Sequence, residues 1–547
     1  MSDPTSKLSA SFEEVNSQEI IQLSSFSKAL LNTQNLSPAK KSSLDSRIEV
    51  SKSISFMAVM YEKLRNALEL HEDHLIRRVA IKRIAKRRLG INPSGKGEGE
   101  NILRELLWSR YVTDGSVGSS EITRVQNIVS TYQYFKSILT PTAPKSSLSL
   151  LEQYLYDLMS TEIDEIIDTT FTHRQSGRLY FVYQTLKEKV VIDNISKELA
   201  DTYFYIACEA SFAKNDLATV RAHLFFLKWG YLSENSQEQL KSLANSFVTE
   251  IKRLEKTIKN PYQEQLLRFV RANAPPYRIL FSLFDKHSTN SANIISNKQL
   301  LTDEVFLTCR SKAIETAQKL KGAALRSIVY IFCTKMIFVL LLEFPLTKYI
   351  FNEVDFKALT VNTIFPPILM GVILLLISPA DKNNPTRIRD RIVEIIDEDT
   401  SFETKKSLTA TPVIKRPLLN FIFGIVYTVM FAAFFAFIYL FLEILHFNII
   451  SKFIFIFFLC VITFFAFRIR TTASEFILKK NENVLNHISD VLFLPFLSIG
   501  KILSNELGRF NVLLLVFDIV IETPFKIFIE IIDEWQKFIK SRKDEIV

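Results

Sequence analysis

Four long apolar stretches distinguish the second half of this 547-residue chain from its first half. An apolar run of about 18 residues or more is typical of a transmembrane helix. Short connectors at 351–357 and 446–448 join the stretches in pairs, so we predict two helical hairpins, 327–378 and 417–468, with a charged cytoplasmic loop at 379–416 between them. The predicted spans cover residues 327–350, 358–378, 418–445 and 449–467.

The preceding part of the chain has the apolar periodicity of helices and no sustained alternation of the strand kind. Residues 1–54 are polar and predict a mostly mobile tail with one short helix at most, whereas 55–326 predict a cytoplasmic domain of antiparallel helices. The expected fold class is all-α: a helical cytoplasmic domain, a four-helix transmembrane region of two hairpins and a C-terminal amphipathic helix. The main helices expected in the cytoplasmic domain cover residues 57–89, 101–111, 120–139, 147–168, 179–192, 194–213, 217–232, 236–259, 261–272 and 303–325.

Residues 469–547 are predicted to form amphipathic cytoplasmic or interfacial helices. From Asp518 onward, charged side chains recur on one side of a helical wheel and apolar side chains on the other. Because the polar face is acidic, we expect it to pack against the basic head or a partner rather than simply adhere to anionic lipid. A fifth span through 512–532 is the alternative, and it would carry Asp518, Glu522, Lys526 and Glu530 into the bilayer.

Basic residues gather on one side of the predicted spans. They precede the first span, recur through the central loop and follow the fourth span, whereas the opposite side offers only Lys348, Lys357 and Lys452. The positive-inside rule therefore places both termini and the central loop in the cytoplasm. The predicted location is the plasma or inner membrane, which the chain crosses several times.

Composition narrows the class of protein further. Only 13 glycines are present, which argues against glycine-rich phosphate loops and a turn-dense β fold. The four cysteines lie far apart, which favours a reducing compartment for the head. The polar N-terminal segment lacks the apolar core of a signal peptide, so none is expected. Because no catalytic motif is found, we expect a protein that is not an enzyme and that binds no cofactor or metal.

One charge lies deep in the predicted spans. Lys335 is near the middle of the first span, and Glu343 follows eight residues later on roughly the same helix face. Charges inside a membrane often mark ion paths, so Lys335 is a candidate functional charge. The alternative is that Lys335 snorkels or pairs within the bundle while Glu343 sits at the far interface. Pro366 and Pro367 predict a kink in the second span, and a kink by itself needs no function.

A strongly basic helix is predicted near residues 77–88. Its basic side chains are candidates for contact with an anionic surface, either the inner leaflet or nucleic acid, with nucleic acid the least favoured. Apolar residues surround the same helix, which favours packing against acidic neighbours instead, and Glu162, Asp164, Glu165 and Asp168 are the candidates for that role. The basic residues are Arg77, Arg78, Lys82, Arg83, Lys86, Arg87 and Arg88.

Two weaker motifs lie next to this helix. Residues 90–97 imitate a phosphate-binding loop, but Gly97 replaces the required Ser or Thr and Pro93 removes a backbone donor, so we expect only a mobile connector. His71 and His74 share one helix edge, but a metal site needs further ligands and the other histidines are scattered. Neither motif is expected to bind a ligand.

Several segments resemble an uncharacterised family of multi-pass membrane proteins of candidate-phyla bacteria. The resemblance implies the same architecture and no assigned chemistry. The segments that carry it are 61–66, 74–78, 100–111, 274–279 and 344–370.

The function expected from the sequence is that of a non-enzymatic, membrane-anchored helical scaffold or adaptor. A transporter or channel component that uses the hairpins and Lys335 is one alternative, and a membrane-tethered nucleic-acid-binding protein is another. The expected partners are the lipid bilayer and either a protein or a second copy of the chain.

Overall fold

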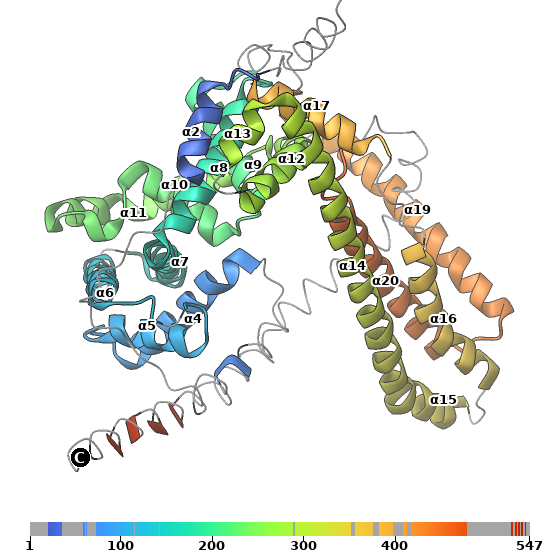
Figure 1. Cartoon of the computed structure of the whole chain (residues 1–547). Coiled ribbons are helices and arrows are strands. Elements are labelled where there is room, and N and C mark those ends of the chain that lie inside the picture. The colour runs from blue at the N-terminus through green and yellow to red at the C-terminus, as the bar shows by residue number, and fades with distance from the viewer. Residues whose placement is uncertain are drawn as a thin grey trace, which may run out of the picture. The chain divides into compact units, whose positions relative to one another are not determined.

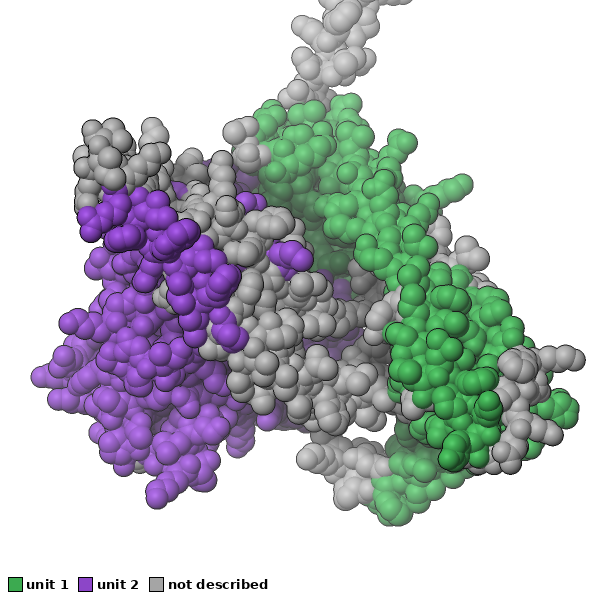
Figure 2. Space-filling view, turned by 90° about the horizontal axis from the view of Figure 1, so that it is seen from below, with its two compact units in different colours: residues 1–23, 272–401, 413–511 green, residues 24–271, 402–412, 512–547 purple. Residues whose placement is uncertain are grey.

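The computed structural model is predominantly helical, with 82% helix and 3% strand, which confirms the all-α class. Contacts divide the chain into two compact units, coloured separately in Figure 2. Unit 1 holds residues 1–23, 272–401 and 413–511, and unit 2 holds residues 24–271, 402–412 and 512–547. The structure describes residues 20–35, 58–60, 62, 73–113, 115–141, 143–287, 290–351, 356–375, 382–397, 408–412, 417–478 and isolated positions between 524 and 542.

Unit 2 is a bundle of helices around an aromatic core. The Phe247 ring makes edge-to-face contacts with Phe135, Tyr154 and Phe225, at centroid distances of 5.0, 6.4 and 5.9 Å. Helix α7 lies at the centre, because it packs against α4, α6 and α10. The elements begin with η1 (Asp73–Leu75), α4 (Ile76–Ile91), α5 (Glu98–Trp108), α6 (Ser119–Leu139), η2 (Lys145–Ser147), α7 (Leu148–Ile167) and α8 (Thr169–Lys187).

The second half of unit 2 follows the predicted boundaries closely because capping residues set its helix starts. Ser196, Asp216 and Ser236 each accept a hydrogen bond from a backbone N–H in the first turn of the helix that follows. Such bonds satisfy backbone donors that a helix start otherwise leaves open. The elements are α9 (Lys197–Ser211), α10 (Leu217–Trp229), η3 (Leu232–Glu234) and α11 (Gln237–Ile258).

Helix α12 (Gln263–Lys286) runs through Pro275 and Pro276, beyond the predicted helix end at residue 272. The sequence prediction gave weight to the proline ring, which removes a backbone donor and crowds the preceding turn. In the structure Ile279 and Leu283 are fully buried just beyond the prolines. Their burial stabilises the part of the helix that follows the prolines.

A short parallel sheet was not predicted. Strand β1 (Val190–Ile192) pairs with β2 (Leu408–Ala410) in the register Val190 with Leu408. Each strand has only three residues, too few to show alternation in the sequence. The pairing therefore depends on contacts between segments far apart in the chain.

The predicted mobile tail contains an ordered part. Helix α2 (Ser25–Gln34) buries Leu30 and Leu31 and packs against α8. The Gln34 side chain accepts hydrogen bonds from the Arg178 guanidinium, the shorter at 2.7 Å. Burial of two leucines is enough to order this polar segment.

Unit 1 is built on one long helical rod. Helix α14 continues through a π-helical turn, η4, into α15, and α16 and α20 pack along it (Figure 1). We call the end of unit 1 with α15 the distal end and the end with α17 the proximal end. The elements are α13 (Ser291–Ser296), α14 (Lys298–Phe338), η4 (Val339–Glu343), α15 (Phe344–Phe351), α16 (Phe356–Leu375), α17 (Asn384–Ile396), α19 (Pro417–Ile444) and α20 (Ile449–Ala473).

Helices occupy all four places where spans were predicted, but only two are long and apolar enough to cross a membrane. Within the described residues these are Lys298–Tyr349 and Phe421–Ile444. The apolar parts of the other two helices, Leu359–Gly371 and Ile449–Thr463, are shorter than the roughly 20 residues that a span requires. The four-span region is thus supported in part.

Part of the predicted central loop 379–416 is helical. Helix α17 within it buries Ile388, Ile392 and Ile396 and packs against α14. Asn384 at its start bonds the backbone of Phe476 and Leu478, 3.1 and 2.9 Å away.

The predicted C-terminal helix is described only at isolated positions. These positions are helical. The apolar side chains among them, such as Phe528 and Trp535, are exposed except for half-buried Ile532. The alternative of a fifth span through 512–532 falls largely outside the described residues.

Candidate intramembrane polar site

A buried polar cluster lies where α14, η4 and α16 meet. Lys335, Glu343 and Asn362 are each 0% exposed. The Lys335 ammonium donates to Glu343 Oε2 at 3.3 Å and to Asn362 Oδ1 at 3.1 Å. It also lies 4.8 Å from the centre of the Phe458 ring on α20, within reach of a cation–π interaction. Glu343, Asn362 and this ring therefore surround the single positive charge of Lys335.

Asn362 links the two charges to a third helix. Its amide nitrogen donates to Glu343 Oε1 at 2.5 Å and to the backbone carbonyl of Ser451 at 3.3 Å. One amide thus bridges α16, η4 and α20. Because an unpaired charge in an apolar interior is costly, the closed geometry makes these groups tolerable there.

Hydrogen bonds continue from this cluster toward the distal end. The backbone N–H of Ser451 donates to Asn448 Oδ1 at 2.8 Å, and the Asn448 amide donates to Thr347 Oγ1 at 3.3 Å. Ser451 and Thr347 are 3% and 4% exposed. The Lys335 cluster is therefore linked through buried Ser451 to half-buried Asn448 in the turn between α19 and α20.

Apolar side chains also pack around the same cluster. Ile331, Met370 and Ile462 belong to one group of buried side chains and are at most 1% exposed. They lie one turn or more from Lys335, Asn362 and Phe458 along their respective helices, toward the proximal end. Ile454 of the same group lies one turn from Phe458 toward the distal end, so apolar packing flanks the cluster on both sides.

Two irregularities in helical geometry flank the cluster. The π-helical turn η4 ends at Glu343, and Pro366 and Pro367 lie one turn after Asn362 inside α16. π-helical turns are rare and occur frequently at functional sites. Here the π-helical turn lies between Lys335 and Glu343 and widens the backbone. A regular helix would separate these two residues by somewhat more than two turns.

The sequence prediction of this site was incomplete. It selected Lys335, and its alternative of pairing within the bundle describes the observed contact. It placed Glu343 at the far interface, whereas Glu343 is fully buried. It missed Asn362, although a lone Asn within an apolar run is a detectable signal.

The predicted basic helix corresponds to α4, and its charges meet carboxylates within unit 2. Arg77 Nε lies 2.5 Å from Asp164, as the packing alternative expected. Arg78 and Lys82 pair instead with Asp216 and Asp157, which the sequence did not indicate. Arg83 pairs with Glu62, and Arg87 and Arg88 share Glu105, whereas Lys86 is exposed.

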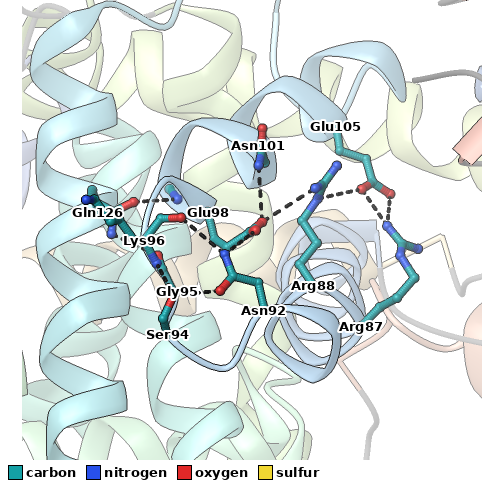
Figure 3. A network of polar contacts seen from close by, with 11 residues as sticks. Arg87, Arg88, Asn92, Ser94, Gly95, Lys96, Glu98, Asn101, Glu105 and Gln126 are labelled. Carbon is teal, nitrogen blue, oxygen red and sulfur yellow. Dashed lines mark hydrogen bonds and ion pairs between the residues drawn. The ribbon is translucent and has the colours of Figure 1, made fainter. Parts of the chain in front are cut away.

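Glu105 is the most enclosed of these carboxylates, with 0% exposure. Its oxygens accept hydrogen bonds from Arg87 at 2.5 Å and from Arg88 Nε at 3.4 Å (Figure 3). Arg88 also reaches Glu98 at 3.4 Å. Two arginines of α4 are thus held against α5, and their side chains are not directed outward for a leaflet or a nucleic acid.

The loop 92–97, predicted to be a mobile connector, is ordered by its own side chains (Figure 3). The Asn92 amide donates to Glu98 Oε1 at 3.0 Å and to the Lys96 carbonyl at 3.2 Å. Gly97 adopts φ +79° just before α5 begins. The Glu98 carboxylate accepts hydrogen bonds where a phosphate-binding loop would offer donors to its ligand.

A second network in unit 2 centres on His223. Its Nδ1 lies 2.7 Å from Glu209 Oε1, and its Nε2 lies 2.9 Å from Glu165 Oε1. Tyr205 donates to Glu209 at 2.6 Å, and Tyr231 donates to Glu165 at 2.6 Å. Sequence reasoning missed this arrangement, because the three charged residues lie on three different helices.

The charges of this network shift its proton equilibria. Burial opposes the charged imidazolium, but the Glu209 and Glu165 carboxylates outweigh it and raise the pKa of His223 to about 10. Burial raises the pKa of the nearby Glu162 to about 7, although Ser233 and Tyr132 donate hydrogen bonds to its carboxylate. An imidazolium clamped on both nitrogens is poorly placed to act as a general base.

The predicted histidine pair is described in part. His74 is exposed and bonds Asn215 at 3.1 Å, while His71 lies outside the described residues. No group of three or more metal-ligating side chains occurs in the part of the chain that the structure describes. No family model matches the chain, and neither a curated protein nor a solved structure matches it significantly.

Proposed function

We propose that this protein is a non-enzymatic, membrane-anchored helical scaffold or adaptor. Unit 2 presents a folded helical body, and unit 1 supplies the anchor. The proposal includes several crossings of the plasma or inner membrane with both termini in the cytoplasm. It also includes membership of the multi-pass family that the sequence resembles.

The observation that carries this proposal is the pairing of charged side chains within unit 2. Most basic side chains of α4 are paired with carboxylates of unit 2, and the His223 imidazole is held by two more. Charged groups that are mutually satisfied stabilise a defined surface rather than act on a substrate. A rigid body of paired helices on an apolar anchor is suited to holding other proteins at a membrane.

The test is gentle extraction of the full chain from its native membrane, followed by chemical cross-linking and quantitative mass spectrometry. We expect a partner in fixed stoichiometry. Recovery of the full chain alone, or only as a homo-oligomer, would contradict the adaptor role.

A transporter or channel component is the second candidate, favoured by one observation. The Lys335 cluster combines buried charges, a π-helical turn and two prolines, and helix irregularities accompany transport sites. This function predicts that Lys335→Leu abolishes a flux measured in proteoliposomes. Unchanged flux in a folded variant would exclude Lys335 from any pathway.

Nucleic-acid binding receives less support, because the α4 arginines already face carboxylates that compete with phosphate. It predicts salt-sensitive binding that falls when Arg78, Lys82 and Lys86 are replaced by Ala. Absence of binding at low salt would remove this candidate.

A further inference from the structure

We propose that strand β1 and Gln265 of unit 2 form a strand-addition site for an extended segment of a partner protein. In the structure the chain's own residues 408–411 occupy this site. The inference rests on the scaffold proposal and deepens it, because it names the kind of partner that unit 2 holds. It is drawn from the hydrogen bonds of these four residues, from the burial of one alanine and from their place in the chain.

Residues 408–411 are bound mainly through their backbone. Strand β2 pairs with β1 in parallel, and the Leu408 N–H donates to the Lys189 carbonyl oxygen at 3.1 Å. The Gln265 amide then pairs with the residue after β2. Its Nε2 donates to the Thr411 carbonyl oxygen at 2.9 Å, and its Oε1 accepts from the Thr411 N–H at 3.2 Å. Gln265 therefore extends the pairing by one residue as a neighbouring strand would, and such main-chain bonds give affinity for an extended peptide.

The side chains of the segment define which sequences fit. Ala410 is 0% exposed and Leu408 is half-buried, whereas Thr409 and Thr411 are exposed. A fully enclosed alanine leaves no space for a larger side chain, because protein interiors are close-packed. The site therefore selects an extended segment whose first residue is apolar and whose third residue is small, with little restriction on the second and fourth.

Residues 408–411 are an addition to unit 2 from a distant part of the sequence. They lie in the stretch 402–412, whose neighbours on both sides, 272–401 and 413–511, belong to unit 1. Among the described residues, β1 is the element against which β2 packs, and no side chain of β2 belongs to the core around Phe247. The core can therefore persist when the segment leaves, and β1 then presents an unpaired edge to a partner.

The test is binding of a fluorescent peptide with the sequence of residues 404–413 to the full chain in lipid nanodiscs, measured by anisotropy. The chain's own segment competes with the peptide at a high local concentration. Ala410→Glu in the chain requires burial of an unpaired carboxylate and should displace that segment. The peptide should then bind roughly tenfold or more tighter than to the wild type. Thr409→Glu, at an exposed position of the same strand, is the matched control and should retain wild-type binding.

Changes in the site and in the peptide test the recognition itself. Gln265→Leu, combined with Ala410→Glu, removes both hydrogen bonds to Thr411 and should weaken peptide binding roughly tenfold. In the peptide, Ala410→Leu should weaken binding to a similar extent, whereas Thr409→Val should leave it unchanged. Equal binding of these peptides, or no binding to the Ala410→Glu chain, would overturn the proposal.

Hydrogen–deuterium exchange of the wild-type chain keeps the proposal testable if Ala410→Glu does not fold. The backbone N–H groups of Leu408 and Thr411 should exchange roughly a hundredfold or more faster than those at the centre of α7, because the segment opens without unfolding of the core. Exchange as slow as that of α7 would show that the segment leaves only when unit 2 unfolds, and the site could not then accept a partner.

Two further outcomes identify the occupant. Self-association of the wild-type chain that the peptide abolishes would assign the site to a second copy and overturn its assignment to another protein. Peptide binding without a captured partner would support the strand-addition site and contradict the scaffold role, whereas a captured partner without peptide binding would do the reverse.

Discussion

At the scale of single residues, charge in this protein is placed in pairs. Glu105 between Arg87 and Arg88, His223 between two glutamates and Lys335 against Glu343 are each enclosed by side chains from other helices. A buried pair adds little net stability compared with apolar packing, but removal of one member leaves the other uncompensated. Single substitutions at these positions should therefore be costly.

Glu105 provides a direct test of that cost. Glu105→Gln removes the carboxylate that Arg87 and Arg88 share, and we expect the free energy of unfolding to fall by about 3–5 kcal/mol. Glu100→Gln on the same helix breaks a more exposed pair with Arg104 and should cost less than about 1 kcal/mol. Denaturant unfolding of both variants measures the difference, and equal losses would contradict the special role of Glu105.

We expect His223 to make unit 2 less stable as the pH becomes alkaline. Its folded pKa of about 10 lies above its ordinary value of 6.5, so its contribution is fully present below about pH 6.5 and is lost as the pH rises toward 10. The contribution is at most about 5 kcal/mol. Thermal unfolding from neutral to alkaline pH should show this decline.

A histidine of the same unit controls for the general effect of alkali. His223→Gln should flatten the pH dependence, whereas His173→Gln, at an exposed position of α8, should retain the wild-type profile. A wild-type slope in His223→Gln would show that another group titrates.

At the scale of elements, a small residue determines how closely two helices can approach each other. A Cβ on Gly99 of α5 would lie 2.6 Å from the backbone nitrogen of Gln126 on α6, and the Gly99 N–H donates to the Gln126 side chain at 2.9 Å. Backbone cannot move aside as a side chain can, so α5 and α6 can approach this closely only with glycine at this position.

Gly99→Ala should therefore destabilise the protein by roughly 1–3 kcal/mol through overpacking. Gly90→Ala is the matched control, because nothing lies within 4 Å of its added Cβ and alanine favours the helix by about 0.5–1 kcal/mol. Denaturant midpoints should thus move in opposite directions. Similar shifts in both variants would contradict the steric account.

At the scale of the whole molecule, the chain forms two units with separate cores. Separate cores predict that unfolding is not a single two-state transition. All three tryptophans, Trp108, Trp229 and Trp535, belong to unit 2, whereas helices occur in both units. Tryptophan fluorescence and far-ultraviolet circular dichroism should therefore give different midpoints, and coincident curves would show that the units unfold together.

Much of the fold follows from local pattern. Helical periodicity and capping residues such as Asp216 and Ser236 act within a few positions, so the boundaries of α10 and α11 are predicted within a few residues. Local pattern does not predict the boundaries of α2, of α17 or of the sheet β1–β2, because each is stabilised by contact with a distant segment. Helix α12 extends beyond its predicted end for the same reason.

The sequence by itself determined the all-α class, the places of the apolar helices and the presence of a deep charge at Lys335. Only the tertiary structure decided which groups meet: Glu105 with Arg87 and Arg88, His223 with Glu165 and Glu209, and Asn362 with Lys335 and Glu343. The physical reason is the separation along the chain over which each effect acts. Hydrophobic period and capping are properties of neighbouring residues, whereas the partner of a charge depends on which helices pack side by side.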